Sequence, residues 1–250
     1  SRAWAGLTVR LSQAAAPRAR VRASHEAPAA AWLAYVDEIR AAIDDGEVRK
    51  VVAARTRELE LAEAADPAAV LIALGLRHPD CTRFGVRRGR VALVGASPER
   101  LIRRRGQAID AEALAGSIAR RGDDAELQAR LLASAKDRDE HELVVRAIAG
   151  TLAPRCAELI VPPVPTVRAL RHVLHLHTPI RGTLRGDDHV LAVAGALHPT
   201  PAVGGTPTAA AIARIAAREP DRGWYAAPVG WFDGDGDGEL AAAIRAGGLA

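Results

Sequence analysis

Two lysines stand apart in a chain whose other basic side chains are all arginine. Of the 34 Lys and Arg residues, only Lys50 and Lys136 are lysine. An arginine keeps its proton in a protein, whereas a lysine that is withdrawn from water can lose it. The two lysines are therefore the amines that could act as a base.

Carboxylates form the second group of candidates. Asp137 and Glu140 are three residues apart in the polar run 136–142, so on a helix they would share one face and could bind a hard cation. The alternative for this run is a solvated helix start, with acids at the positive end of the helix dipole. Glu99 follows a buried-looking strand and the tight turn 95–98. By itself, a glutamate in such a place is more typical of a protein surface.

The segment 198–207 is a rigid loop rich in proline and glycine. Its backbone amides could approach an anionic ligand closely, because glycine leaves the main chain open. A purely structural loop is the alternative for this segment.

The elements that position these residues follow from hydrophobic periodicity, since helical spacing predicts helices and alternation predicts strands. The predicted helices cover residues 29–45, 66–77, 125–152, 190–197 and 206–219. The predicted strands cover residues 7–11, 51–61, 84–86, 91–94, 101–102, 172–180, 224–232 and 240–245. Because the strands often arrive as hairpins, the fold class is predicted to be α+β with layered antiparallel sheets.

Composition narrows the class of protein. With 250 residues, 49% hydrophobic and 26% charged, the chain is typical of a globular domain. No apolar run approaches the ~20 residues that span a membrane, and no secretion signal is recognisable. The two cysteines, Cys81 and Cys156, cannot build a disulfide framework or a zinc site. The net charge of +4, with short arginine clusters, favours a solvated surface over a nucleic-acid site. A cytoplasmic protein is expected.

Taken in order and spacing, several segments resemble the chorismate-utilising enzymes, the family of isochorismate, salicylate, anthranilate and aminodeoxychorismate synthases. The matching segments are residues 49–55 (RKVVAAR), 95–99 (GASPE), 114–117 (LAGS), 136–141 (KDRDEH), 175–182 (HLHTPIRG), 198–207 (HPTPAVGGTP), 221–225 (DRGWY) and 243–245 (AIR). The resemblance implies one catalytic domain over residues 1–250, with antiparallel sheets stacked and helices on the outside. Residues 1–27 would be the remnant of a preceding part.

The resemblance also implies roles for individual residues. Lys50 would be the base and Glu99 the acid, and Glu140 with Asp137 would hold Mg²⁺, the one cofactor implied. Tyr225 and Arg245 would grip the enolpyruvyl carboxylate of the substrate chorismate. The residues implied to contact this substrate are Leu114, Ala115, Gly116, Ser117, His175, Thr178, Ala202, Val203, Gly204, Gly205, Tyr225 and Arg245.

Three positions favour the isochorismate synthase branch of the family. Lys50 stands where water-using members have a lysine base, which the ammonia-using anthranilate synthases lack. Ala115 stands where aminodeoxychorismate synthases carry a nucleophilic lysine, and Ala202 where salicylate-forming relatives tend to have threonine. The expected reaction is an isomerisation, in which water attacks C2 of chorismate and the C4 hydroxyl leaves. A salicylate synthase, and a non-catalytic binding protein of the same fold, stay as alternatives.

The resemblance ends near the last residues. Family members continue beyond the strand at 244–245 with a glutamate-bearing helix that supplies a second magnesium ligand, whereas this chain ends at Ala250. The sequence also has no methionine at its start. The C-terminal part of the fold is therefore expected to be missing, and the fragment alone is expected to lack part of its metal site. A monomer without a glutaminase subunit is expected, in siderophore or menaquinone synthesis.

Overall fold

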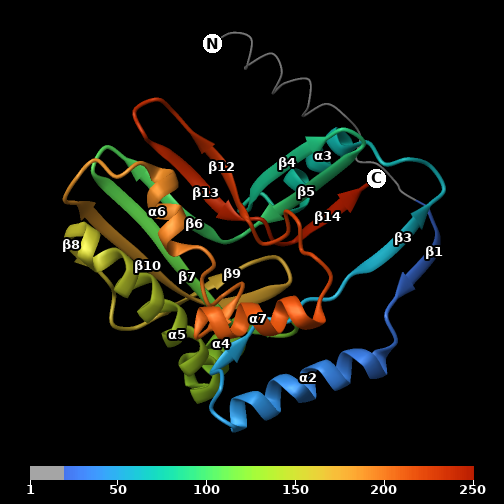
Figure 1. Ribbon diagram of the computed structural model, residues 1–250, viewed down its shortest axis with the longest axis horizontal. Helices are drawn as coiled ribbons and strands as arrows, with labels where there is room; N and C mark the ends of the chain where they lie inside the picture. The colour runs from blue at the N-terminus through green and yellow to red at the C-terminus, as the bar shows by residue number, and fades with distance from the viewer. Residues whose placement is uncertain (1–19) are drawn as a thin grey trace.

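A computed structural model describes residues 20–250, so the strand expected at 7–11 lies outside the described residues. The centre of the fold is a seven-stranded sheet whose neighbouring strands are all antiparallel (Figure 1). Its strands, in spatial order, are β12 (Pro228–Phe232), β13 (Gly238–Ala242), β6 (Arg100–Arg105), β7 (Ala108–Ala119), β10 (Val173–Leu184) and β8 (Cys156–Ile160), with β9 (Thr166–Ala169) also paired to β10.

Three smaller sheets surround the central one. The largest has the order β14 (Ala246–Leu249), β5 (Val91–Ser97) and β4 (Thr82–Arg88). The other two are pairs, β1 (Val21–Glu26) with β3 (Arg57–Leu61) and β2 (Lys50–Val51) with β11 (Gly205–Thr206). The predicted α+β class with antiparallel sheets is confirmed.

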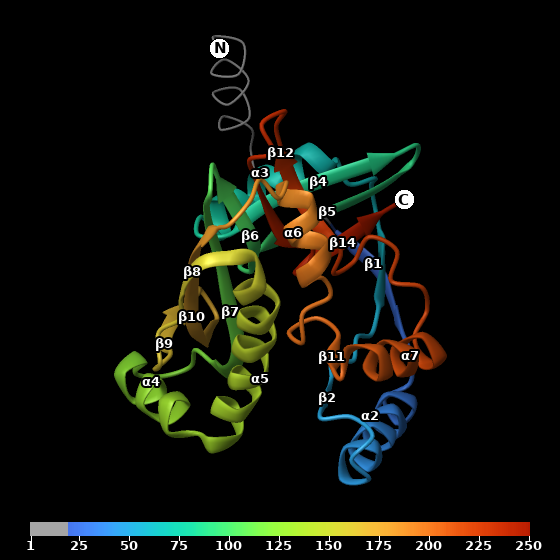
Figure 2. The ribbon, with the colours of Figure 1, turned by 60° about the vertical axis from the view of Figure 1, so that its left-hand side comes forward.

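Helices α5 (Ala135–Leu152) and α6 (Val190–Leu197) cover one face of the central sheet and enclose the main core. α4 (Asp124–Ala133) packs on β10 beside α5 through a smaller cluster of leucines. Helix α3 (Pro67–Arg77) lies on β4 and β5. Helices α2 (Ala29–Asp44) and α7 (Thr208–Arg218) lie on the other side of the β2–β11 pair from α4 and α5 (Figure 2). A short 3₁₀ helix (Ala153–Arg155) joins α5 to β8.

Strand β7 separates the core from the site. Successive side chains of a strand point to opposite faces of a sheet. Ile109, Ala111 and Ala113 belong to the main core with α5, so the alternate residues, Asp110 and Glu112, lie on the face away from that helix. In this part of β7, acidic residues therefore lie on one face and apolar residues on the other.

Several predicted bounds are wrong. The helix expected at 125–152 is two helices, because Ser134 ends α4 and caps α5 with a hydroxyl that accepts from the Asp137 amide. The strand expected at 51–61 is interrupted after β2, and residues 224–227 form turns before β12 begins. The strand expected at 240–245 ends at Ala242, and Arg245 adopts a positive φ of 54° before β14. Strands β1, β8, β9, β11 and β14, and most of β7, were not predicted.

Within residues 20–250, no helix combines the length and the apolar character that a membrane crossing requires.

Candidate active site

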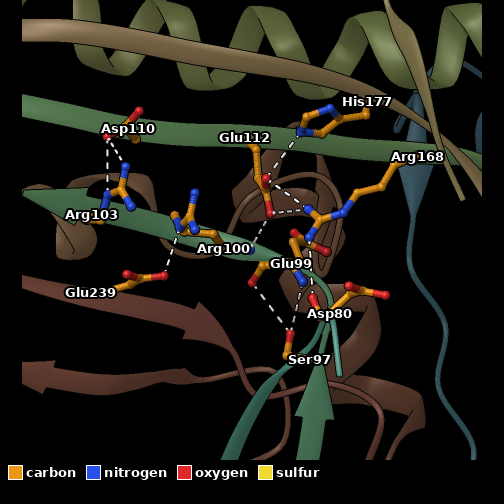
Figure 3. Close-up of polar contacts among 10 residues, drawn as sticks. All are labelled: Asp80, Ser97, Glu99, Arg100, Arg103, Asp110, Glu112, Arg168, His177 and Glu239. Atoms are coloured by element: carbon orange, nitrogen blue, oxygen red, sulfur yellow. Dashed lines mark hydrogen bonds and ion pairs between the residues drawn. The ribbon is translucent and has the colours of Figure 1, made fainter. Parts of the chain in front are cut away.

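Glu99 lies in the connection between β5 and β6 and is 6% exposed. Its backbone N–H donates to the Ser97 hydroxyl at 3.2 Å (Figure 3). The tight turn expected at 95–98 is wrong in its bounds, because β5 continues to Ser97 and the connection is residues 98–99. Burial first, and then the negative charge of Glu112, raise the pKa of the Glu99 carboxyl to about 7, against the positive charges of Lys50 and Arg245, which lower it. A carboxyl group with this pKa holds a proton near neutral pH and can donate it.

Glu112, on β7, is the hub of the polar contacts around this acid (Figure 3). Its Oε1 accepts from the backbone N–H of Arg100 at 2.9 Å and from Arg168 Nη1 at 2.9 Å. His177 Nε2 lies 3.1 Å from Oε2. Burial by itself would raise the pKa of Glu112, but the contacts with His177, the Arg100 amide and Arg168 lower it below its ordinary value.

The loop 198–207 positions Lys50. Its short strand β11 pairs with β2, and Lys50 lies opposite Thr206 in that pairing. The amide of Arg49 donates to Thr206 O at 2.7 Å, and that of Val52 to Gly204 O at 2.8 Å. Gly205 has φ +149°, and a Cβ there would collide with the Lys50 carbonyl oxygen. Glycine is therefore required where the loop touches the lysine strand.

The amine of Lys50 forms an ion pair with Glu140 of α5, with Nζ 2.9 Å from Oε1. Both residues line a cavity of about 820 Å³ between β2 and the start of α5, to which Lys136 also contributes. The lysine side chain is 12% exposed and the glutamate 36%. The structure thus brings together the expected base and an expected magnesium ligand.

Glu219 and Arg222 form an ion pair that also binds residues 52–54, the segment that follows Lys50. Glu219 Oε1 accepts from the Ala54 amide at 2.9 Å and from the Tyr35 hydroxyl of α2 at 3.1 Å. Arg222 donates to both oxygens of Glu219 and to Val52 O at 2.7 Å. Burial first, and then the charge of Glu219, raise the pKa of Tyr35 to about 12.

Three of the expected substrate-binding residues meet at His175. Ser117 Oγ lies 2.6 Å from its Nδ1, and Arg245 Nη2 lies 3.5 Å from its Nε2. Because a guanidinium only donates, Nε2 accepts and Nδ1 carries the proton. Burial, and then the charge of Arg245, lower the pKa of His175 to about 4, so the ring is neutral.

Arg245 and Tyr225 line one cavity of about 480 Å³ with three more arginines, Arg55, Arg57 and Arg222, and with two carboxylates, Glu219 and Asp221. Four guanidinium groups around one cavity suit an anionic ligand, because their forked donors match carboxylate oxygens. Tyr225 and Arg245, the two residues expected to hold a carboxylate, thus line the same cavity, in which arginines outnumber carboxylates.

Other expected residues play structural parts in this structure. Thr178 is 1% exposed and its hydroxyl donates to His141 Nε2 at 2.8 Å, while His141 Nδ1 donates to Ala115 O at 3.1 Å. Gly116 has φ +75°, and a Cβ there would lie 2.9 Å from Asp137 O, so β7 and α5 approach closely.

The remaining expected contacts lie around this region. Leu114 is buried on β7 opposite His177, and Ala202 packs against the main core. Val203 forms a small cluster with Tyr225, and Gly204 lies in the loop that holds β2.

The two expected magnesium ligands, Asp137 and Glu140, contact different residues. Asp137 Oδ2 accepts from the Ser134 hydroxyl at 2.5 Å, and Glu140 faces Lys50. Among residues 20–250, no group of three or more His, Cys, Asp or Glu side chains could hold a metal. Mg²⁺ is commonly bound by one or two carboxylates, completed by substrate oxygens and water. Glu140, partly exposed beside a cavity, fits that kind of site.

Sequence reasoning missed five residues of the site: Glu112, Arg168, His177, Glu219 and Arg222. Glu112 lies on a strand that was not predicted beyond residue 109. Its signal in the sequence is the alternation of Asp110 and Glu112 with apolar residues, which is typical of a strand between a core and a polar site. Glu219 and Arg222 are three residues apart in the sequence. This spacing does not indicate that they contact residues 35, 52 and 54.

Comparisons with known proteins show which family this chain resembles. The family described as "Chorismate binding enzyme" matches residues 4–250. The salicylate biosynthesis isochorismate synthase of Pseudomonas aeruginosa is 47% identical over 86% of this chain and 46% of its own length. The isochorismate synthase MenF of Bacillus subtilis is 37% identical over 92% of this chain and 50% of its own length. The chain thus spans about half the length of these relatives.

A solved structure gives the same picture. The menaquinone-specific isochorismate synthase of Escherichia coli superposes with a TM-score of 0.87 at 32% identity, over 95% of this chain and 56% of that one. Sequence and fold lead to one conclusion: this chain belongs to the chorismate-binding enzyme family.

Proposed function

We infer that this chain carries the catalytic site of an isochorismate synthase, which converts chorismate to isochorismate. Support comes from the relatives named isochorismate synthase and from the effect of the Lys50 charge on buried Glu99, which indicates that the two residues are near each other. The observation that carries the proposal is Glu99, a buried carboxyl group with a pKa of about 7 within the field of Lys50 and Arg245.

The reaction needs a base and an acid that act on different atoms of one ring. Lys50 takes a proton from water as its oxygen bonds to C2. The ring double bonds shift, the C4–O bond breaks, and Glu99 gives its proton to the departing hydroxide, which leaves as water. The atoms balance as an isomerisation, after which Lys50 returns its proton and Glu99 regains one.

Lys50 must first leave its ion pair with Glu140, since an adjacent carboxylate favours the charged form of an amine. We propose that Glu140 holds Mg²⁺, which would neutralise its charge and polarise the ring carboxylate of the substrate. Asp137 would contribute only if its hydrogen bond with Ser134 were exchanged.

The substrate would be held by the cavity that Arg245 and Tyr225 line. Arg245 and Tyr225 would bind the enolpyruvyl carboxylate, and neutral His175 would contact the ring without adding charge. The burial of Thr178, with its hydroxyl held by His141, assigns it to the support of β10.

The test compares turnover of chorismate, with Mg²⁺, in the full-length protein that contains this chain and in its variants K50A and E99Q. Each substitution should lower turnover by about 10²–10⁴-fold while the fold stays intact, because each removes one proton transfer. Lys136→Ala is the matched control, since Lys136 lines the same cavity as Lys50 but has no role in this chemistry. Wild-type turnover in K50A and E99Q would contradict the assignment.

Salicylate synthase is the second candidate, because a relative 47% identical is named for salicylate biosynthesis. Chromatography of the products separates the two: isochorismate alone is expected, and salicylate with pyruvate would indicate the second activity. Binding of chorismate without any product would indicate a non-catalytic protein.

A further inference from the structure

Glu112 is hydrogen-bonded to the backbone next to Glu99. It projects from the middle of β7 on the face away from α5, and its Oε1 accepts from the Arg100 amide at 2.9 Å. Arg100 directly follows Glu99 in the chain. A carboxylate that accepts from an amide fixes the position of that peptide group. Glu112 therefore restrains the backbone that carries the Glu99 side chain.

The Glu112 carboxylate is itself held in its charged form. Arg168 Nη1, from β9, lies 2.9 and 3.0 Å from its two oxygens, and His177 Nε2, from β10, lies 3.1 Å from Oε2. The side chain is only 8% exposed. Buried charges persist when they are paired and hydrogen-bonded, and each lone-pair direction of this carboxylate has a donor nearby.

The charges that act on Glu99 come from three elements. Glu112 on β7 is negative, while Lys50 on β2 and Arg245, between β13 and β14, are positive. Two carboxyl groups in one buried place resist being ionised together. Because Glu112 has an arginine and a histidine as partners and Glu99 has neither, Glu112 is the one that stays charged.

We propose that Glu112 is a positioning residue for the acid: it holds the peptide bond after Glu99 in place and faces Glu99 with a second, permanently charged carboxylate. This rests on the proposed role of Glu99 as the proton donor. The two cations that the site needs for base catalysis and substrate binding both favour an ionised Glu99. Burial is the larger reason that Glu99 keeps its proton, and the charge of Glu112 adds to it by offsetting these two cations.

Glu112→Gln tests the charge with little change in shape, because the amide oxygen of glutamine can still accept from Arg100. The readout is the titration of the Glu99 carboxyl carbon by ¹³C NMR, assigned by its absence in E99Q. The pKa of Glu99 should fall in E112Q by about 1 unit, which is a tenfold change in the protonation equilibrium. Turnover above that pKa should fall about tenfold, mainly in kcat.

Asp110→Asn is the matched control. Asp110 lies two residues earlier on β7, pairs with Arg103 at 2.8 Å (Figure 3) and is absent from the charges that act on Glu99. Its replacement should leave the Glu99 titration unchanged. A purely structural role for Glu112 would lower stability without moving that titration.

If E112Q does not fold, the double variant E112Q/R168Q removes both charges at once and leaves no buried cation unpaired. It should show the same fall in the pKa of Glu99, since Arg168 does not act on that carboxyl. An unchanged Glu99 titration in a folded variant without the Glu112 charge overturns the inference. Wild-type turnover in E99Q would overturn the proposed function instead. The NMR titration of Glu99 is a separate measurement, so the two failures can be told apart.

Discussion

The buried carboxyl of Glu99 should make the protein less stable as the pH rises, and glutamine in its place should remove that effect. Burial, and then the charge of Glu112, raise the pKa of Glu99 from its ordinary value of 4.5 to about 7 in the folded protein. In the unfolded chain the carboxyl ionises at its ordinary value. As the pH rises from 4.5 to about 7, the unfolded state releases a proton that the folded state keeps. The free energy of unfolding therefore falls over this range and is level on either side.

The size of the effect follows from the two pKa values. The interval between 4.5 and about 7 corresponds to about 3 kcal/mol. This is a large share of the 5–15 kcal/mol that typically separates folded from unfolded proteins. Glutamine has nearly the same shape and no charge, so E99Q should be more stable than the wild type by about 3 kcal/mol near pH 8. Near pH 4 the pH-dependent part of the difference should vanish.

The assay is urea denaturation of wild type and E99Q at several pH values between about 4 and 8, read by circular dichroism. Glu239→Gln is the control, because Glu239 is a partly exposed carboxylate paired with Arg100 at 2.9 Å, and removal of its charge should not stabilise the fold. A difference between E99Q and wild type that is the same at all pH values, or that favours the wild type near pH 8, would refute the assigned state of Glu99.

Three further substitutions probe the groups around the acid. R245Q should raise the pKa of His175 from about 4, although burial, the larger cause, should keep it below 6.5; NMR titration of the imidazole measures this. R222M should lower the free energy of unfolding by about 3–5 kcal/mol, because it leaves the Glu219 carboxylate, 5% exposed, without its cation; urea denaturation should show partial recovery in the double variant E219Q/R222M. G205A should lower kcat about 100-fold in a folded protein, because a Cβ there displaces the strand that carries the base; wild-type kcat would contradict this.

The sequence predicted the fold class and most helices because their apolar residues repeat at clear periods. The prediction was wrong where the apolar residues do not repeat at a clear helical or strand period. Strand β7 reads as a mixture of alanine and acid residues, yet its alanines face α5 and Glu112 faces the site. The break at Ser134 was missed because the capping serine lies between two helices of similar pattern. Local pattern cannot show which polar residue ends a helix once both sides are helical.

The site was predicted through motifs, and the motifs gave the residues without their partners. Lys50 and Glu99 were expected as base and acid, but the ion pair of Lys50 with Glu140 joins positions 90 residues apart in the chain. The contact of Glu112 with Arg168 joins two strands, one of which was not predicted at all. Such contacts depend on strand register, which the sequence of one strand does not define.

The most direct test of the central claim, that Lys50 and Glu99 add one water to chorismate and remove another, is an isotope experiment. Wild-type protein is incubated with chorismate and Mg²⁺ in H₂¹⁸O, and the product is analysed by mass spectrometry. The account predicts isochorismate with one ¹⁸O at C2, and formation of this labelled product about 10²–10⁴-fold more slowly in K50A and in E99Q. Isochorismate without ¹⁸O, or labelled isochorismate formed by both variants at the wild-type rate, would contradict it.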